Sequence, residues 1–267
     1  MLDKTKYFDE VKSYKFLANK SLGQNFLVDS LIAEKIVEKL EVKSSDNVLE
    51  IGAGLGSLSY FLSQKEGQKT LIDVDEKMLG FLQEKYKNVP DLLVKRQNIL
   101  KADLSEYTKI IGNLPYYITS GIVEHILLNA TNAKKVVLMC QKEVYPKLTE
   151  NNISPLSILL NYVSKISSPM NVSRNAFVPV PHVDSVVFEL EPNENIKNPT
   201  NKDVYKLMCK LFLHRRKNIL NCLSTVCKTR EESKIVLSKC GLNENLRPEQ
   251  LKISDFQKIF EVLQSHR

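Results

Sequence analysis

Residues 112–121 read GNLPYYITSG and combine an amide side chain, a proline and an aromatic ring directly after an apolar run. Pro115 has no backbone donor, so a central strand must end before it. Asn113 and Tyr116 are then displayed at a strand end, which is where ligands bind in a parallel sheet. An amide oxygen there can accept hydrogen bonds, and a tyrosine ring can stack on a flat ligand. A turn that only connects two elements is the alternative for so short a motif.

A second candidate site lies in residues 48–61, VLEIGAGLGSLSYF, which predict a strand, a glycine-rich turn and the start of a helix. Gly52 and Gly54 let the backbone bend sharply and approach a ligand closely. Ser57 stands where the dinucleotide fingerprint has its last glycine. Glu50 would repel a pyrophosphate but suits a ligand with a positive charge.

Asp73 lies at the end of the next predicted strand, 21 residues beyond Gly52. An acidic residue at about this distance accepts hydrogen bonds from ribose hydroxyls. Together with Glu50, it favours a nucleoside that carries a cation and no phosphate. S-adenosylmethionine, with its sulfonium and ammonium groups, fits this description. A turn that only packs a helix, next to an unrelated acid, is the alternative.

The elements that must position these residues alternate between strands and helices. Short apolar runs predict buried strands at 47–51, 70–73, 92–95, 109–112, 135–140 and 184–190. Apolar residues at helical spacing predict helices at 31–40, 79–86 and 122–127. This alternation predicts an α/β fold with a parallel sheet covered on both faces.

A polar stretch with two prolines, residues 191–203, predicts a linker between two domains. We therefore expect an α/β domain at 1–193 and a helical domain at 194–267. Residues 194–267 hold 15 Lys and Arg against 8 Asp and Glu, whereas the remainder holds 23 of each. A positive charge confined to one domain indicates a polyanionic partner, although lysines that only keep the domain soluble are the alternative.

Residues 203–220 predict a helix with a basic face opposite an apolar one. Its basic stripe is formed by Lys202, Lys206, Lys210, His214 and Lys217. Such a stripe can follow a phosphate backbone. Arg215 falls on the apolar side of this helix, which requires either a bend in the helix or a partner for the guanidinium.

The rest of the composition excludes other classes of protein. No apolar run approaches the roughly 20 residues that span a bilayer. The first residues are polar and of mixed charge, unlike a signal peptide. The five cysteines are odd in number and lack metal-binding spacing, so we expect free thiols, no metal and a cytoplasmic protein.

Segments along nearly the whole chain, from about Ser21 to the last helix, resemble the KsgA-type small-subunit rRNA adenine N6,N6-dimethyltransferases. They are SLGQNFLVD (21–29), VLEIGAGLG (48–56), NLPYYITS (113–120), NAFVPVPHVDSVVFEL (175–190), HRRKNIL (214–220) and RPEQL (247–251). The pairing of GQNFL with NLPY is the most specific feature. Related methylases of large-subunit rRNA share the catalytic domain, but the F-x-P-x-P-x-V-D and RRK segments favour the small-subunit branch.

The resemblance implies a Rossmann-like S-adenosylmethionine-dependent methyltransferase sheet with a small, all-helical C-terminal domain. It implies dimethylation of two adjacent adenosines near the 3′ end of small-subunit rRNA, with a role in ribosome biogenesis. The partner is then the immature small ribosomal subunit, and a monomer is expected. The alternatives are an adenine methylase of large-subunit rRNA, of the antibiotic-resistance type, and a non-catalytic assembly or transcription factor. Intact Asn113, Pro115 and Tyr116 argue against loss of chemistry.

The resemblance also implies which residues bind the cofactor. By position, Asn25 and Leu27 of GQNFL line its methionine end. The family usually has Asp after the third strand, where this sequence has Asn98. The Asn98 amide can still accept from the adenine amine and donate to the neighbouring ring nitrogen. The expected cofactor site is Asn25, Leu27, Glu50, Gly52, Gly54, Asp73, Asn98 and Asn113.

The implied chemistry assigns roles to the GNLPYYITSG segment. The adenine amine is a poor nucleophile because its lone pair is delocalised into the ring, and an acceptor that pulls on its hydrogens counters this. Asn113 Oδ1 and the Leu114 carbonyl, held by Pro115, are the candidate acceptors. Tyr116 is expected to stack on the flipped base, and Phe177, by the resemblance, on its other face. No general base is needed before attack, and positioning alone contributes on the order of 7–11 kcal/mol.

The expected RNA-binding residues come from the C-terminal domain and from the matching HRRKNIL segment. They are Lys206, Lys210, Arg215, Arg216 and Lys217.

Overall fold

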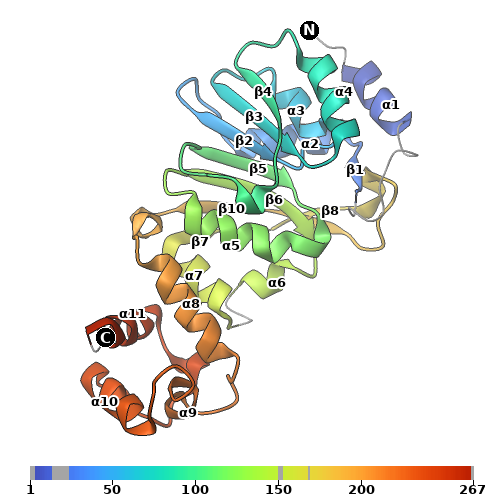
Figure 1. Cartoon of the computed structure of the whole chain (residues 1–267). Helices are drawn as coiled ribbons and strands as arrows, with labels where there is room; N and C mark the ends of the chain where they lie inside the picture. The colour runs from blue at the N-terminus through green and yellow to red at the C-terminus, as the bar shows by residue number, and fades with distance from the viewer. Residues whose placement is uncertain (1–3, 14–23, 150–152, 168, 266–267) are drawn as a thin grey trace. The chain divides into compact units, whose positions relative to one another are not determined.

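The structure is a computed structural model that describes residues 4–13, 24–149, 153–167 and 169–265. Residues 21–23, part of the SLGQNFLVD segment, lie outside the described residues. The chain forms two compact units (Figure 1). Unit 1 contains Met1–Tyr145 and Ser164–Asn193, and unit 2 contains Pro146–Val163 and Glu194–Arg267.

Unit 1 is built on an eight-stranded sheet with the strand order β4-β3-β2-β5-β6-β10-β7, and β8 also pairs with β10. Its parallel strands are β2 (Asn47–Ile51), β3 (Gln68–Asp73), β4 (Leu92–Arg96), β5 (Lys109–Asn113) and β6 (Lys135–Gln141). The antiparallel part consists of β7 (Ser164–Ile166), β8 (Met170–Val172) and β10 (Ser185–Pro192). All six strands expected from the sequence are therefore present.

Helices precede and connect the parallel strands in unit 1 (Figure 1). They are α1 (Lys4–Ser13), α2 (Ser30–Lys39), α3 (Ser57–Leu62), α4 (Glu76–Tyr86) and α5 (Thr119–Asn129). Asp29 and Asp75 cap α2 and α4, because each carboxylate accepts from backbone N–H groups of the first turn. The first three helices pack on one face of the sheet through a cluster that includes Val48, Ile111 and Val137.

A separate two-stranded ribbon holds the segment that was expected to contact the cofactor. Strands β1 (Phe26–Leu27) and β9 (Phe177–Val178) pair antiparallel, with Leu27 opposite Phe177. The Val28 N–H donates to the Ala176 carbonyl at 2.8 Å and extends this pairing. The ribbon therefore fixes the backbone that follows Asn25.

Unit 2 is helical. Its longer helices are α7 (Pro155–Val163), α8 (Asn201–Phe212), α10 (Arg230–Cys240) and α11 (Ile253–Ser265). The shorter ones are α6 (Tyr145–Leu148) and α9 (Ile219–Leu223). Helix α6 begins at Tyr145, the last residue of the first segment of unit 1. The sequence division placed all of 1–193 in the first domain. The structure differs, because α7 packs against α8 and α11 and so brings residues 146–163 into unit 2.

One sequence expectation about this region was wrong. The helix expected at 203–220 ends at Phe212, and residues 213–217 form an exposed turn before Asn218 caps α9. Arg215 lies in this turn, which explains why it did not fit the helical pattern. The expected linker at 191–203 does contain the boundary between the two units, after Asn193, and within it β10 continues to Pro192 and a short 3-10 helix, η6 (Glu194–Lys197), precedes α8.

No helix within the described residues is both long enough and apolar enough to cross a membrane.

Candidate active site

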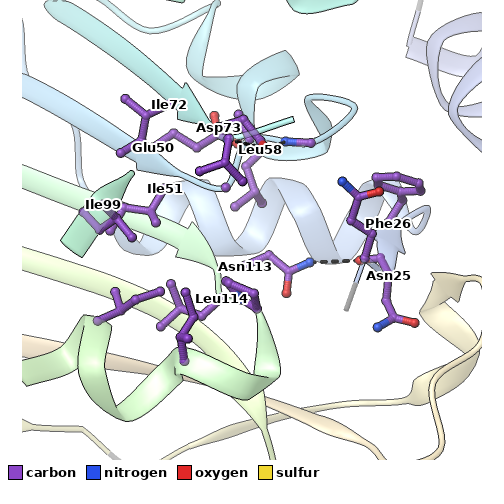
Figure 2. A pocket seen from close by; sticks show the side chains of 18 of the residues that line it. Asn25, Phe26, Glu50, Ile51, Leu58, Ile72, Asp73, Ile99, Asn113 and Leu114 are labelled. Atoms are coloured by element: carbon purple, nitrogen blue, oxygen red, sulfur yellow. Dashed lines mark hydrogen bonds between the residues drawn. The ribbon is translucent and has the colours of Figure 1, made fainter. Parts of the chain in front are cut away.

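A pocket of about 380 Å³ lies at the carboxyl ends of β2, β3, β4 and β5. The GNLPYYITSG segment and the glycine-rich turn both line it, so the two motifs found in the sequence form one site. Figure 2 shows Glu50, Asp73, Asn113 and Asn25 arranged around this cavity.

The glycine-rich turn joins β2 to α3 on one wall of the pocket. Gly52 and Gly54 have φ values of 65° and 54°, a left-handed conformation that favours glycine. The N–H groups of Gly52 and Ala53 both donate to the Ile72 carbonyl, at 2.9 and 3.1 Å. The turn is therefore tied to the end of β3 by its own backbone.

Asp73, the last residue of β3, holds the same turn through its side chain. Its Oδ2 accepts from the Gly54 N–H at 2.8 Å, and its Oδ1 accepts from the N–H groups of Val74 and Asp75 at 2.7 and 2.9 Å. Burial raises the pKa of Asp73, and the three backbone hydrogen bonds oppose this effect. A carboxylate has about four acceptor positions, so one remains for a ligand hydroxyl.

Glu50 is a buried acid on the pocket wall, with 2% of its surface exposed. Its Oε2 accepts from the Ser59 hydroxyl at 2.6 Å. Burial is the main cause that raises the pKa of Glu50 to about 8, against the lowering effect of Ser59. The carboxyl is therefore mostly neutral near pH 7 without a ligand, and a cation beside it would favour its ionised form.

Asn113 stands at the end of β5 with its amide held in one orientation. Gly112 lets β5 approach β2 here, because a Cβ at this position would lie 2.8 Å from the Ile51 carbonyl oxygen. The Asn113 Nδ2 donates to the Asn25 carbonyl at 3.2 Å (Figure 2). Within the described part of the chain, Asn113 Oδ1 has no hydrogen-bond partner. It is an open acceptor on the pocket wall.

Leu114, Pro115 and Tyr116 continue the same wall. The Leu114 N–H donates to the Met139 carbonyl at 2.9 Å, while its own carbonyl accepts no hydrogen bond from the described residues. Tyr116 is half-buried, and its hydroxyl lies 3.4 Å from the Ser185 hydroxyl on β10. This contact ties the ring to the sheet.

Asn98 follows β4 and lines the pocket. Its Oδ1 accepts from the Leu100 N–H at 3.0 Å and so caps the short 3-10 helix η3 (Ile99–Lys101). This bond uses one of the two acceptor positions of the side-chain oxygen, so the other position and the amide Nδ2 both remain for a ligand.

The structure brings almost all of the expected site residues to one cavity. Those that line it are Asn25, Leu27, Glu50, Gly52, Gly54, Asp73, Asn98, Asn113, Leu114, Pro115 and Tyr116. Phe177 does not line it, which corrects the expectation that this ring faces the target base. Its side chain is 0% exposed and belongs to the core cluster beneath the β1–β9 ribbon. In this structure it supports Leu27 instead.

The sequence reasoning missed the apolar walls and the serine partners of the site. Ile72 and Ile99 line the pocket beside Asp73 and Asn98. Their positions next to the two polar strand ends were the available signal. No local sequence signal indicated Ser59 and Ser185, whose hydroxyls bond to Glu50 and Tyr116. Each of these bonds joins residues whose contact depends on the tertiary fold.

The expected RNA-binding residues lie in unit 2. Lys206 and Lys210 are exposed on α8, and Lys206 forms a 3.2 Å ion pair with Asp203. Arg215, Arg216 and Lys217 are exposed in the turn after α8.

The parallel sheet, the glycine-rich turn and the pocket at its carboxyl end define a Rossmann-like methyltransferase. Two solved structures share this fold over most of the chain. The dimethyladenosine transferase from Plasmodium falciparum is 25% identical with a TM-score of 0.74, over 89% of this chain and 96% of that one. The 23S rRNA methyltransferase ErmE is also 25% identical, with a TM-score of 0.64, and the match covers 90% of this chain and 100% of that one.

The chain belongs to the ribosomal RNA adenine dimethylase family, whose model matches residues 15–265. The ribosomal RNA small subunit methyltransferase A of Pediococcus pentosaceus is 32% identical, over 95% of this chain and 92% of that protein. The protein of the same name from Malacoplasma penetrans is 33% identical, over 94% of this chain and 93% of that protein. The family, fold class and enzyme class expected from the sequence are thereby confirmed.

Proposed function

We propose that this protein transfers methyl groups from S-adenosylmethionine to the exocyclic N6 of two adjacent adenosines near the 3′ end of small-subunit rRNA. Two methyl groups are added to each adenosine. The small-subunit names of the relatives support this substrate over large-subunit rRNA. The enzyme acts as a cytoplasmic monomer on the immature small ribosomal subunit.

The chemistry of the pocket fits S-adenosylmethionine. A buried carboxyl, Glu50, suits a ligand whose charge is positive. Asp73 retains one acceptor position for a ribose hydroxyl, and Ile72 and Ile99 supply apolar surface for an adenine ring. When bound, S-adenosylmethionine supplies an electrophilic methyl group on a sulfonium.

The observation that carries this proposal is the pair of open acceptors beside Tyr116. Asn113 Oδ1 and the Leu114 carbonyl are both unpaired among the described residues and lie on consecutive residues of the pocket wall. Two acceptors can bind the two hydrogens of one exocyclic amine and draw its lone pair out of the ring. Tyr116 holds the flipped base by stacking.

Recognition of RNA is assigned to unit 2. Lys206 and Lys210 on α8, with Arg215, Arg216 and Lys217 in the following turn, are exposed and basic. Cations of this kind neutralise phosphates and give affinity without sequence specificity.

The test is to incubate the protein with methyl-labelled S-adenosylmethionine and either unmethylated small subunits or large subunits, and then to map the label. We expect label on adjacent adenosines near the 3′ end of small-subunit rRNA, and much slower labelling with the Asn113→Ala variant. Label confined to large-subunit rRNA would identify the enzyme as a large-subunit methylase. Transfer to neither RNA would leave a binding protein on the same fold.

A further inference from the structure

The N-terminal helix α1 places Tyr7 directly behind the glycine-rich turn. The Tyr7 hydroxyl donates to the Leu55 carbonyl at 2.6 Å and also lies 2.9 Å from the Gly56 carbonyl oxygen. The Tyr86 hydroxyl on α4 is 3.1 Å away. Because the single proton of Tyr7 is directed at the turn, Tyr86 is the donor in the bond between the two hydroxyls. The result is a buried chain of hydrogen bonds that ends on the turn.

Gly56 makes this close approach possible. It has a φ of 81°, and a Cβ at this position would lie 2.5 Å from the Tyr7 hydroxyl and 2.9 Å from Leu82 Cδ2. Any other residue would force α1 or α4 away from the turn. The third glycine of the turn therefore serves the contact with Tyr7, whereas Gly52 and Gly54 line the pocket.

The turn is consequently held from two sides. Asp73 accepts from the Gly54 N–H, and Tyr7 donates to the carbonyls of Leu55 and Gly56. Gly52, Gly54 and Leu55 face the pocket between these two attachments. A loop held in its binding conformation loses less entropy when a ligand binds, so such bonds increase affinity.

The Tyr7 hydroxyl is not what attaches α1 to unit 1. Phe8 and Val11 on the same helix are 4% and 0% exposed, and the Tyr7 ring packs 4.9 Å from the ring of Tyr60, measured between centroids. An ion pair joins Lys4 to Glu34 at 2.6 Å. Removing only the hydroxyl should therefore leave the helix in place.

We infer that Tyr7 is a positioning residue for the cofactor pocket, because it fixes the carbonyls of the glycine-rich turn from the side opposite the ligand. This inference rests on the proposed function, since it takes S-adenosylmethionine as the ligand of the turn. It assigns to α1 a task in cofactor binding although α1 contributes no residue to the pocket lining.

The test is the Tyr7→Phe variant, with Tyr107→Phe as the matched control. Tyr107 is 3% exposed and is not among the residues that line the pocket. We expect Tyr7→Phe to weaken S-adenosylmethionine binding about 3- to 10-fold in calorimetric titration, the range for one lost hydrogen bond. The KM for the cofactor should rise by the same factor while kcat at saturation is unchanged. Amide exchange at Leu55 and Gly56 should accelerate.

Three other outcomes would count against the inference, and they can be told apart. If the parental protein bound S-adenosylmethionine and Tyr7→Phe bound it equally well, the inference alone would fail. An equal loss of affinity in Tyr107→Phe would assign the effect to general loosening of unit 1 and would also overturn it. If the parental protein bound no S-adenosylmethionine, the proposed function itself would fail, and the inference with it.

Discussion

Asn113 is oriented by one hydrogen bond from its amide nitrogen, and its oxygen accepts none from the residues that the structure describes. We expect Asn113→Ala to lower the rate of methyl transfer about 100-fold, the lower range for loss of a preorganised hydrogen-bonding group in an active site. Single-turnover transfer to small subunits measures this. Asn129→Ala is the control, because the Asn129 amide bonds to His125 outside the pocket. A parental rate in Asn113→Ala would remove this residue from the catalytic mechanism.

Glu50 gives cofactor binding a dependence on pH. Its raised pKa of about 8 means that the empty pocket holds a proton at neutral pH. A cationic ligand favours the ionised carboxylate, so binding releases this proton, and affinity should rise up to about tenfold per pH unit between pH 6 and 7.5. Titration calorimetry in buffers of different ionisation enthalpy measures the released proton. If Glu50→Gln kept the same rise in affinity, the proton would come from another group.

The same pKa affects stability with the opposite sign. In the unfolded chain Glu50 ionises with its ordinary pKa of 4.5, whereas in the folded protein it holds the proton up to about pH 8. Between these values the folded state binds more protons, so Glu50 lowers the free energy of unfolding as the pH rises. Cofactor binding, which favours the ionised carboxylate, should offset part of this loss.

Asn98 has one side-chain oxygen, and the cap of η3 already uses one of its two acceptor positions. From the sequence, the Asn98 amide was expected to accept from the cofactor adenine amine and to donate to the neighbouring ring nitrogen. The structure alters that expectation. A carboxylate can cap Leu100 with one oxygen and accept from the adenine amine with the other, so Asn98→Asp should bind S-adenosylmethionine about 3- to 10-fold more tightly. Asn98→Ser keeps a cap but lacks a second side-chain oxygen, so it should bind no more tightly than the parental protein. Weaker binding by the Asp variant would show that Nδ2 donates to the ligand.

The strands could be predicted from the local sequence pattern, and each wrong prediction about the other elements has a physical reason. Residues 135–141, KVVLMCQ, are apolar almost throughout because both faces of β6 are buried, and this pattern is readable from sequence. The helix end at Phe212 was missed because apolar residues recur at Ile219 and Leu220 at compatible spacing. Asn218, an N-cap residue, was the one local signal of a new helix. The burial of Phe177 depends on its pairing with Leu27, which local sequence does not encode.

The residues that line the candidate site could be predicted from the sequence more completely than the residues that hold them in place. Strand ends place Asn113, Asp73 and Asn98 together because parallel strands share one carboxyl edge, so spacing alone was enough. The contacts of Tyr7 with the turn join residues 48 and 49 positions apart and follow from packing of α1. No local pattern in α1 indicates such a role.

The basic residues of α8 and its following turn provide a prediction about RNA. Replacing Lys206, Lys210 and Lys217 with Gln should weaken RNA binding and flatten its salt dependence by roughly 2–3 units of slope, at about 0.7–0.9 per lost phosphate contact. Binding measured across a salt series gives the slope. Lys234, Lys252 and Lys258, exposed elsewhere in unit 2, form a matched triple whose replacement should change the slope less. Equal effects from both triples would mean a diffuse attraction without a defined RNA-binding face.

At the scale of the whole molecule, the chain crosses between its two units more than once. It leaves unit 1 after Tyr145, returns at Ser164 and leaves again after Asn193. Helix α7 lies in residues 146–163, between the two segments of unit 1, and its buried residues include Leu159, Leu160 and Val163. Its packing partners in unit 2 include α8 and α11. The catalytic unit is therefore not a continuous segment of sequence.

This division predicts the result of truncation. A chain that ends at Asn193 keeps α7 but loses α8 and α11, so the apolar face of α7 becomes exposed to solvent. We expect this fragment to bind a hydrophobic dye and to aggregate, as measured by fluorescence and light scattering. The same fragment with Leu159→Ser and Leu160→Ser should do so less. A monodisperse fragment without dye binding would show that α7 is covered within unit 1.

The position of α7 also matters while the protein is being made. About 90 residues separate Val163 from Ile253, the first residue of α11. At about 5–20 residues per second, the ribosome takes roughly 5–18 s to synthesise them. Until then α7 lacks its last partner, and β10, the central strand of the antiparallel part, is completed only during the same period. An adenine dimethylase of this architecture therefore passes through a nascent stage in which its sheet is incomplete and an apolar helix is exposed, which is the stage at which chaperones bind.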